Sequence, residues 1–232
     1  TESLLDGEIT LPKLSSGTDG NIISYDASGN PVAIATGNDG QVLTSTGAGS
    51  PPAFEAAPGG GLVYLAKATA SSSSTVDFLN NFSATYDNYV IFMDGITMST
   101  DNTGLLELRV VTGGSTAQTS GYSTTFSCRK DTGSDNHHEG NGAVYAKLQP
   151  VGTGTGTGEN YGGRIDIYGV NSTSNYTLGN VQYAIFNTSQ ETETGQGAFC
   201  WETATAVTGV RFLTNTGTIS AGNFTLFGVA KS

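Results

Sequence analysis

The residues best suited to chemistry in this sequence lie in one polar segment, Asp131–Glu139, which holds both histidines. Neighbouring side chains point apart on an extended backbone, so His137 and His138 are poorly placed to bind one metal ion together. The segment also lacks the later bidentate glutamate of a calcium loop. We therefore expect no metal site, and we interpret the segment as an exposed hairpin tip that forms a contact surface.

Other patterns that could indicate catalysis are incomplete. The glycine-rich segment 152–158 lacks the spacing, the following lysine and the helix of a phosphate-binding loop, so we expect a floppy loop between strands. No nucleophile elbow occurs, and neither histidine lies near a recognisable serine or cysteine partner. Glu191 and Glu193 stand in a polar stretch that is typical of a solvated loop. The sequence predicts no catalytic residue and no cofactor, and we do not expect an enzyme.

Aromatic side chains outside the strands would provide flat surfaces for sugar rings, although a tryptophan within a strand usually belongs to the core. The aromatic candidates are Tyr122, Tyr161, Tyr176 and Trp201. With the polar segment added, the candidate receptor contacts are Asp135, His137, His138, Tyr161 and Tyr176.

The two cysteines, Cys128 and Cys200, stand far apart and in no metal-binding spacing. They either form one disulfide or remain two small buried thiols on strands. We expect the second arrangement, because cysteines outside disulfides are commonly buried.

Composition excludes several classes of protein. The 232 residues carry a formal charge of −11, with 9 Lys and Arg against 20 Asp and Glu. Without a basic excess to neutralise phosphates, we expect no nucleic-acid binding. No run of about 18 apolar residues occurs, so we expect no membrane insertion. The first ten residues lack the basic and apolar regions of a secretory signal.

The composition changes sharply near residue 60. Residues 1–61 contain only two aromatic residues, Tyr25 and Phe54, whereas residues 62–232 contain the other nineteen. We expect four segments, the last of them a folded domain with its own core. They are an N-terminal segment 1–16, a repeat region 17–57, a Pro/Gly linker 58–61 and a C-terminal domain 62–232.

The repeat region contains two units offset by 20 residues without a gap, one beginning at Gly17 and the other at Gly37. Each unit has an Asp-Gly turn, a short apolar strand, a second turn and a strand after proline, which predicts one β-hairpin. A hairpin alone is marginal in water, and no cysteine is available here to staple it. If the region is ordered, copies of the same segment are the simplest source of a core. The alternative is a flexible tether.

The C-terminal domain has about ten short apolar or alternating runs separated by turn residues, which predicts a β-sandwich. Eight or more antiparallel strands over about 170 residues favour a jelly roll. No segment forms a convincing long helix. The best helical candidate is one or two turns at Val76–Phe82.

The 20-residue repeat resembles units in the fibre proteins of tailed bacteriophages, especially marine ones. The motifs Gly17-Thr-Asp-Gly-Asn-Ile-Ile-Ser and Gly37-Asn-Asp-Gly-Gln-Val-Leu-Thr carry this resemblance. The segments Tyr86–Phe92, Val207–Leu213 and Gly217–Val229 similarly look like strands of phage fibre head domains. The resemblance covers most of the chain but consists of short β motifs, and it brings no catalytic residues.

The resemblance implies a homotrimeric virion fibre, whose N-terminal region attaches to other capsid, collar or tail proteins. Its β-sandwich head would face outward and bind a host-surface glycan. The alternatives are a capsid decoration or cement protein without a receptor role and, from another class, a glycan-active enzyme. We expect the densest early aliphatic cluster to be the anchor, namely Leu4, Leu5, Ile9, Leu11 and Leu14.

Overall fold

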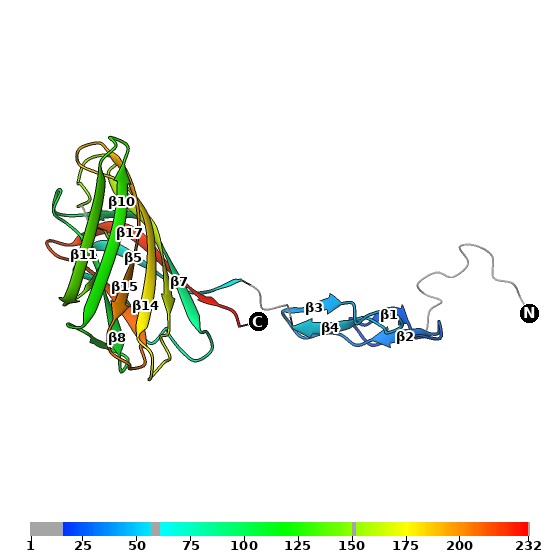
Figure 1. The fold of residues 1–232 in the computed structure, drawn as a ribbon. Helices are drawn as coiled ribbons and strands as arrows, with labels where there is room; N and C mark the ends of the chain where they lie inside the picture. Colours follow the sequence, from blue (N-terminus) through cyan, green and yellow to red (C-terminus); the bar gives the residue numbers. More distant parts are fainter. Residues whose placement is uncertain (1–15, 57–60, 150–151, 232) are drawn as a thin grey trace, which may run out of the picture. The chain divides into compact units, whose positions relative to one another are not determined.

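The computed structural model describes residues 16–56, 61–149 and 152–231 (Figure 1). The chain divides into two compact units, Thr1–Gly59 and Gly60–Ser232. Throughout the described residues the regular structure is β-strand, which confirms the prediction of an all-β protein. Within the same ranges, no helix is long and apolar enough to cross a membrane.

The first unit contains two antiparallel hairpins, β1–β2 and β3–β4. Their strands are β1 (Ile22–Tyr25), β2 (Pro31–Ile34), β3 (Gln41–Thr44) and β4 (Ala53–Ala56). The sequence repeats align without a gap, yet the strand registers differ by one residue. Ile23 lies opposite Ala33 in the first hairpin, whereas Leu43 lies opposite Phe54 in the second. Because a slip of one residue changes which side chains share a face, the two hairpins present different surfaces.

The second unit, which we call the head, is built from two antiparallel sheets (Figure 1). The larger sheet has the strand order β11 (Asp135–Ala143), β10 (Tyr122–Lys130), β15 (Thr192–Trp201), β14 (Thr177–Phe186), β13 (Asn160–Tyr168), β7 (Asn88–Met98), β17 (Ile219–Val229) and β5 (Leu62–Ser73). The smaller sheet has the order β12 (Ala146–Lys147), β8 (Leu106–Thr112), β16 (Gly209–Thr214) and β6 (Thr75–Phe78), with β9 (Thr116–Ala117) also paired to β8.

The two sheets share one hydrophobic core. Phe212 of the smaller sheet and Phe224 of the larger sheet are both fully buried, and their ring centroids lie 4.6 Å apart. The Tyr122 hydroxyl of β10 accepts a hydrogen bond of 2.9 Å from the backbone N–H of Val110 on β8. Apolar packing and hydrogen bonding therefore hold one face of the larger sheet against the smaller one.

The opposite face of the larger sheet is exposed, as the alternation along β14 shows most clearly. Val181 and Tyr183 are buried, while Asn180 and Gln182 between and beside them are exposed. Successive side chains of a strand point to opposite faces, so the exposed set lies on one outer surface. That outer surface carries the polar side chains considered below.

The expected helical turn at Val76–Phe82 is wrong, because residues 75–78 form strand β6. Val76 and Phe78 are buried, and Asp77 between them forms an ion pair with Arg211 on β16. This period of two is that of a half-buried strand, and the cross-strand ion pair fixes its register.

The polar segment Asp131–Glu139 is also more regular than a hairpin tip. Strand β11 begins at Asp135 and pairs with β10 along its length, so only residues 131–134 form the turn. The histidines therefore lie on a strand at the edge of the larger sheet.

Candidate functional site

His137 and His138 point to opposite faces of the larger sheet, as expected for neighbours on a strand. His137 is exposed and lies opposite Ser127 of β10. His138 is half-buried, and this burial, together with the positive charge of Lys147, lowers its pKa below the ordinary value. Asp135 lies opposite Arg129 and forms an exposed ion pair with it at 3.8 Å. Asp135 and His137 consequently share the outer face, whereas His138 does not.

The expectation that Tyr161 contacts a receptor is wrong for this fold. Its side chain is fully buried, and its ring stacks on Tyr183 at a centroid distance of 5.7 Å. Burial strongly raises the pKa of the Tyr161 hydroxyl, which therefore stays protonated. Tyr122 and Trp201 are buried as well, whereas Tyr176 is half exposed in the loop between β13 and β14.

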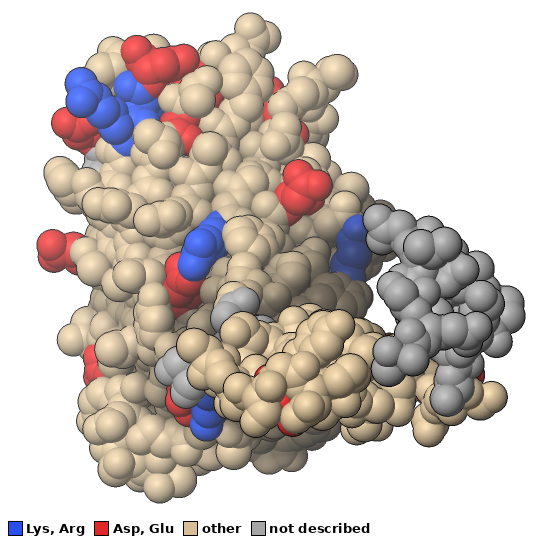
Figure 2. All heavy atoms as spheres, turned by 90° about the vertical axis from the view of Figure 1, so that its right-hand side faces the viewer, with Lys and Arg blue, Asp and Glu red and all other residues tan. Residues whose placement is uncertain are grey.

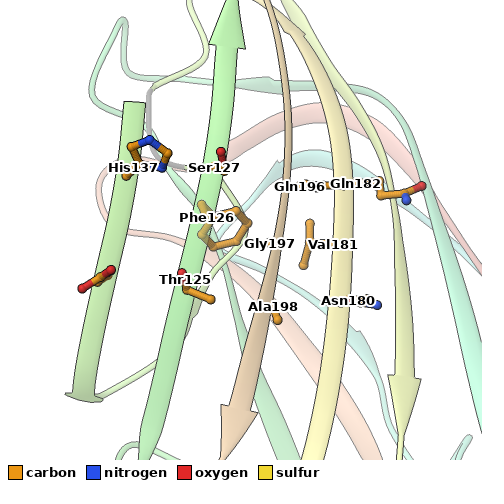
Figure 3. A pocket seen from close by; sticks show the side chains of 11 residues that line it. Thr125, Phe126, Ser127, His137, Asn180, Val181, Gln182, Gln196, Gly197 and Ala198 are labelled. Atoms are coloured by element: carbon orange, nitrogen blue, oxygen red, sulfur yellow. The ribbon is translucent and has the colours of Figure 1, made fainter. Parts of the chain in front are cut away.

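Two adjoining depressions of about 430 and 500 Å³ lie on the outer face of the larger sheet. They share Ser127, His137, Gln182 and Gln196, which come from strands β10, β11, β14 and β15 (Figure 3). We call this surface the outer trough and define it by its exposed polar side chains and one alanine. These residues are Thr125, Ser127, Arg129, Asp135, His137, Glu139, Asn180, Gln182, Thr194, Gln196 and Ala198.

The strand register arranges most of the trough side chains in two rows that cross four strands, and Thr194, Arg129 and Asp135 form a shorter row beside them. The first row runs Gln182, Gln196, Ser127, His137, and the second runs Asn180, Ala198, Thr125, Glu139. Neighbouring strands lie about 4.8 Å apart, so each of the two longer rows spans about 14 Å. Ala198 is the shortest side chain of its row, and it leaves a hollow between Asn180 and Thr125.

The amide, hydroxyl and imidazole groups of the two longer rows form no hydrogen bond with another described residue. This holds for Asn180, Gln182 and Gln196, and also for Ser127 and His137 (Figure 3). An amide side chain both donates and accepts hydrogen bonds, as do a hydroxyl and a neutral imidazole. The outer trough therefore offers donors and acceptors together at the molecular surface.

A smaller depression of about 220 Å³ adjoins the outer trough and shares Thr125 and Ala198 with it. We call it the apolar recess. Its remaining lining residues are Ser123, Thr124, Leu178, Phe199 and Cys200. Leu178 is 50% exposed and lies opposite Cys200 in the strand register, so the recess is bordered by an aliphatic side chain that the chain itself leaves uncovered.

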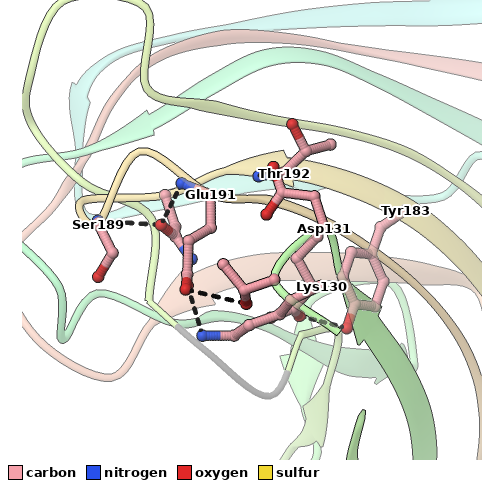
Figure 4. Close-up of polar contacts among 9 residues, drawn as sticks. Lys130, Asp131, Tyr183, Ser189, Glu191 and Thr192 are labelled. Atoms are coloured by element: carbon pink, nitrogen blue, oxygen red, sulfur yellow. Dashed lines mark hydrogen bonds and ion pairs between the residues drawn. The ribbon is translucent and has the colours of Figure 1, made fainter. Parts of the chain in front are cut away.

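Positive charges in and beside the trough are already paired. Arg129 pairs with Asp135, and Lys130 at the end of β10 donates a 2.7 Å hydrogen bond to Glu191 (Figure 4). This contact raises the pKa of Lys130 and lowers that of Glu191, so both groups stay charged. On the face drawn in Figure 2, blue side chains mostly adjoin red ones and broad uncharged areas lie between them.

The contact between Lys130 and Glu191 belongs to a larger set that joins two hairpin ends (Figure 4). The backbone N–H of Asp131 donates to the carbonyl of Thr192, and the Asp131 carboxylate accepts from the N–H of Thr192. The β10–β11 turn and the β14–β15 turn are thereby held together at one end of the trough. Glu191 is a structural ion-pair partner at this position.

The glycine-rich segment folds around a carboxylate of its own chain. The backbone N–H of Gly156 donates to Glu159 at 2.6 Å, and the N–H of Thr155 donates to Asp101. A Cβ at Gly154 would lie 1.7 Å from the same Glu159 carboxylate, so a larger residue there would have to displace that side chain. Backbone N–H groups of this segment thus donate to carboxylates of the chain itself, where a phosphate loop would donate to a bound anion.

Glu193 lies under the sheet and away from the trough. It is fully buried and accepts a 3.0 Å hydrogen bond from the Tyr183 hydroxyl, so it does not face Glu191 across a groove. Among the described residues, no group of three or more His, Cys, Asp or Glu side chains could hold a metal ion.

Cys128 and Cys200 do not form a disulfide with each other. Cys128 is buried on β10, where it faces the core, and Cys200 lies on the outer face of β15 as part of the apolar recess. Both lie on strands, as expected, but the expectation that both are buried is wrong for Cys200, which is half-buried.

Sequence reasoning missed Asn180, Gln182 and Gln196. Asn180 and Gln182 stand between buried residues of β14, a strand with a period of two, and that alternation is the signal that would have placed them on an outer face. Gln196 stands between two half-buried glycines of β15 and carries no such signal. The aliphatic anchor candidates Leu4 to Leu14 lie outside the described residues. Comparison of the chain with protein-family models, curated proteins and solved structures finds no match.

Proposed function

We propose that the chain is a structural component of a bacteriophage virion, a trimeric fibre that displays its head for attachment to a host-surface glycan. Its N-terminal region anchors the fibre to other virion proteins, and the hairpins form the shaft beneath a jelly-roll-like head. One observation supports this proposal most directly. The hairpins expose large apolar side chains that the chain does not cover, and none of the described residues 16–56 is buried.

The first hairpin has two apolar faces. Ile23, which is 65% exposed, shares one face with Tyr25, which is 64% exposed. Ile22 shares the other face with Ile34 and Val32. Burying one such side chain contributes about 1.5–3 kcal/mol, so a hairpin with two uncovered apolar faces gains from association on both sides.

The second hairpin has one apolar face and one mixed face. Leu43 and Phe54 lie opposite each other on the apolar face. On the mixed face, the Thr44 hydroxyl donates a 2.7 Å hydrogen bond to the Glu55 carboxylate. A surface of this kind suits a hairpin that packs inward against its copies and faces water on the outside.

The simplest partner that could cover these faces is a second copy of the same segment. In a symmetric assembly, identical copies place the same apolar side chains next to one another. The number three comes from the resemblance to fibre proteins. Three heads on one fibre would present three outer troughs to a cell, and avidity makes weak individual contacts sufficient for attachment.

The native mass of the full chain, measured by light scattering over a range of concentrations, tests the fibre. We expect about three times 23.8 kDa. The double variant Ile23→Ser, Leu43→Ser removes apolar surface from both hairpins and should shift the protein towards monomer. The matched control is Leu178→Ser, an exposed leucine of the head, which should leave the mass unchanged.

A monomeric full chain at every concentration would overturn the trimer. The capsid decoration protein would then be the better description, because a hairpin region that orders only on the particle needs no copies of itself.

A further inference from the structure

The outer trough has the hydrogen-bonding chemistry of a saccharide site. Gln182, Gln196 and Ser127 stand in one row, and each can donate and accept a hydrogen bond without losing a partner in the protein. Sugar hydroxyls also donate and accept, so a row of such groups matches a polyol along its length. Water can satisfy these exposed groups when no ligand is bound. A ligand must therefore replace several of the hydrogen bonds with water at once in order to bind.

The charges around the trough favour an uncharged ligand. Arg129 is paired with Asp135, and Glu139 adds a carboxylate to the second row. The whole chain carries a charge of −11, which repels polyanions at long range. An acidic polysaccharide would meet two carboxylates, Asp135 and Glu139, against the single cation Arg129 among the lining residues, whereas a neutral one incurs no such penalty.

The apolar recess further restricts the class of ligand that fits the outer trough. Thr125 and Ala198 border both depressions, so a ligand seated in the trough places its substituents over Leu178 and the Cys200 side chain. A plain hexose has only hydroxyl substituents to offer there. An acetamido group has a methyl for the recess beside an N–H and a carbonyl that match the side-chain amides of the rows.

From these three observations we infer that the outer trough and the apolar recess together bind a neutral oligosaccharide whose units carry acetamido groups. The inference rests on the proposed attachment role and specifies its ligand class. Glu139 and Asp135 stand four residues apart on β11, about 13 Å along the strand, which exceeds the separation of carboxylates in glycoside hydrolysis. The site is therefore assigned to binding without cleavage.

Two matched pairs of ligands test the acetamido group, with the full chain observed by isothermal titration or protein-detected NMR. Chitohexaose and cellohexaose share their linkage and differ in the acetamido groups, and N-acetylgalactosamine and galactose form the second pair. We expect at least one acetamido ligand to bind about tenfold or more tightly than its partner.

Three variants locate the site. Gln182→Ala with Gln196→Ala removes two amides and should weaken binding about tenfold or more. Leu178→Ser should remove the preference for the acetamido member of the pair while leaving weak binding of both. Asn175→Ala removes an exposed amide from the β13–β14 loop and is the control that should bind as the unaltered chain does.

Equal affinity within both ligand pairs, absence of binding by all four ligands, or full binding by the double glutamine variant would each overturn the inference. The native mass separates this result from the fibre proposal. If the protein is a trimer that does not bind acetamido sugars, the fibre proposal holds and the saccharide site is wrong. If it is a monomer that binds them, the saccharide site holds and the fibre proposal is wrong.

Discussion

The hairpin unit and the head both build their strands from short apolar runs but reach opposite results. Ile23 in the first hairpin is 65% exposed, whereas Ile91 and Ile165 in the larger sheet are fully buried. The difference lies in what faces each strand. The head supplies a second sheet from the same chain, whereas each hairpin within residues 16–56 is a two-stranded sheet of its own. Apolar patterning alone thus predicts strands, while burial depends on the number of layers a chain can build.

The largest expected loss of stability comes from removing a large side chain from the core of the head. Phe212 is fully buried between Phe78 and Phe224, and Phe212→Ala should lower the free energy of unfolding by about 3–5 kcal/mol. Urea denaturation measures this loss, which should be independent of protein concentration. Ile23→Ala in the hairpin should instead change stability only as the concentration changes. A concentration-independent loss from Ile23→Ala would remove the distinction between the two units.

The next effect is a pH dependence confined to the head. Burial raises the pKa of Glu107 to about 7, against the opposing influence of Tyr145, Arg109 and Lys147. Because this value lies above the ordinary 4.5, the native state holds the proton more tightly than the unfolded state does. The contribution of Glu107 to stability is therefore fully present below pH 4.5 and is lost as the pH rises through 7, by at most about 3 kcal/mol.

The variant Glu107→Gln should flatten this part of the stability profile in urea denaturation at several pH values. Equal slopes for the variant and the unaltered chain between pH 4.5 and 7 would contradict the assignment to Glu107.

A smaller effect probes close packing with a single added methyl group. A Cβ at Gly209 would lie 2.0 Å from the backbone oxygen of Phe78, so Gly209→Ala should cost about 1–3 kcal/mol. Gly17 in the repeat region has nothing within 4 Å, so in one copy Gly17→Ala should be neutral. Thermal unfolding of both variants tests the contrast. A marked loss from Gly17→Ala would place a neighbouring copy against that residue and sharpen the comparison.

The smallest effect distinguishes two ion pairs within the head. Arg211 and Asp77 form two hydrogen bonds of 2.8 and 2.6 Å at half-buried positions, and Asp77→Asn should cost about 1 kcal/mol. Arg129 and Asp135 are exposed and 3.8 Å apart, so Asp135→Asn should change stability by less than about 0.5 kcal/mol. A double-mutant cycle for each pair measures the two coupling energies, and equal values would show that solvent exposure does not control them.

Local pattern was enough to predict the β class and the hairpins, because those features depend on residues close in the sequence. Local pattern did not predict the structure of segments whose strand partner is distant in the sequence or whose burial depends on one. Residues 135–143 include two glycines and many polar side chains and look like a loop, yet β10 offers them an edge on which to form β11. Tyr161 follows a glycine-rich loop and looks exposed, but it shares its face with Ile165 and Ile167.

The outer trough could not be predicted without knowing the order of the strands in the larger sheet. Its rows depend on β10 lying beside β15, two strands separated by four others in the chain. Single residues such as Gln182 and Gln196 carry no local sign of being neighbours. His137 was found because histidines are rare in this chain, not because its partners were visible.

The pairing of β5 with β17 determines when the head can form during synthesis. The Thr69 hydroxyl of β5 donates to Asn223 of β17, 154 residues further along the chain. β17 also separates β5 from β7, so the sheet lacks an interior strand until that segment has emerged from the ribosome. Each hairpin, in contrast, closes over a few residues and can form at once. In the proposed fibre, the hairpins of different copies could therefore meet while their heads are still unfinished. A product truncated before β17 exposes its core and is open to degradation.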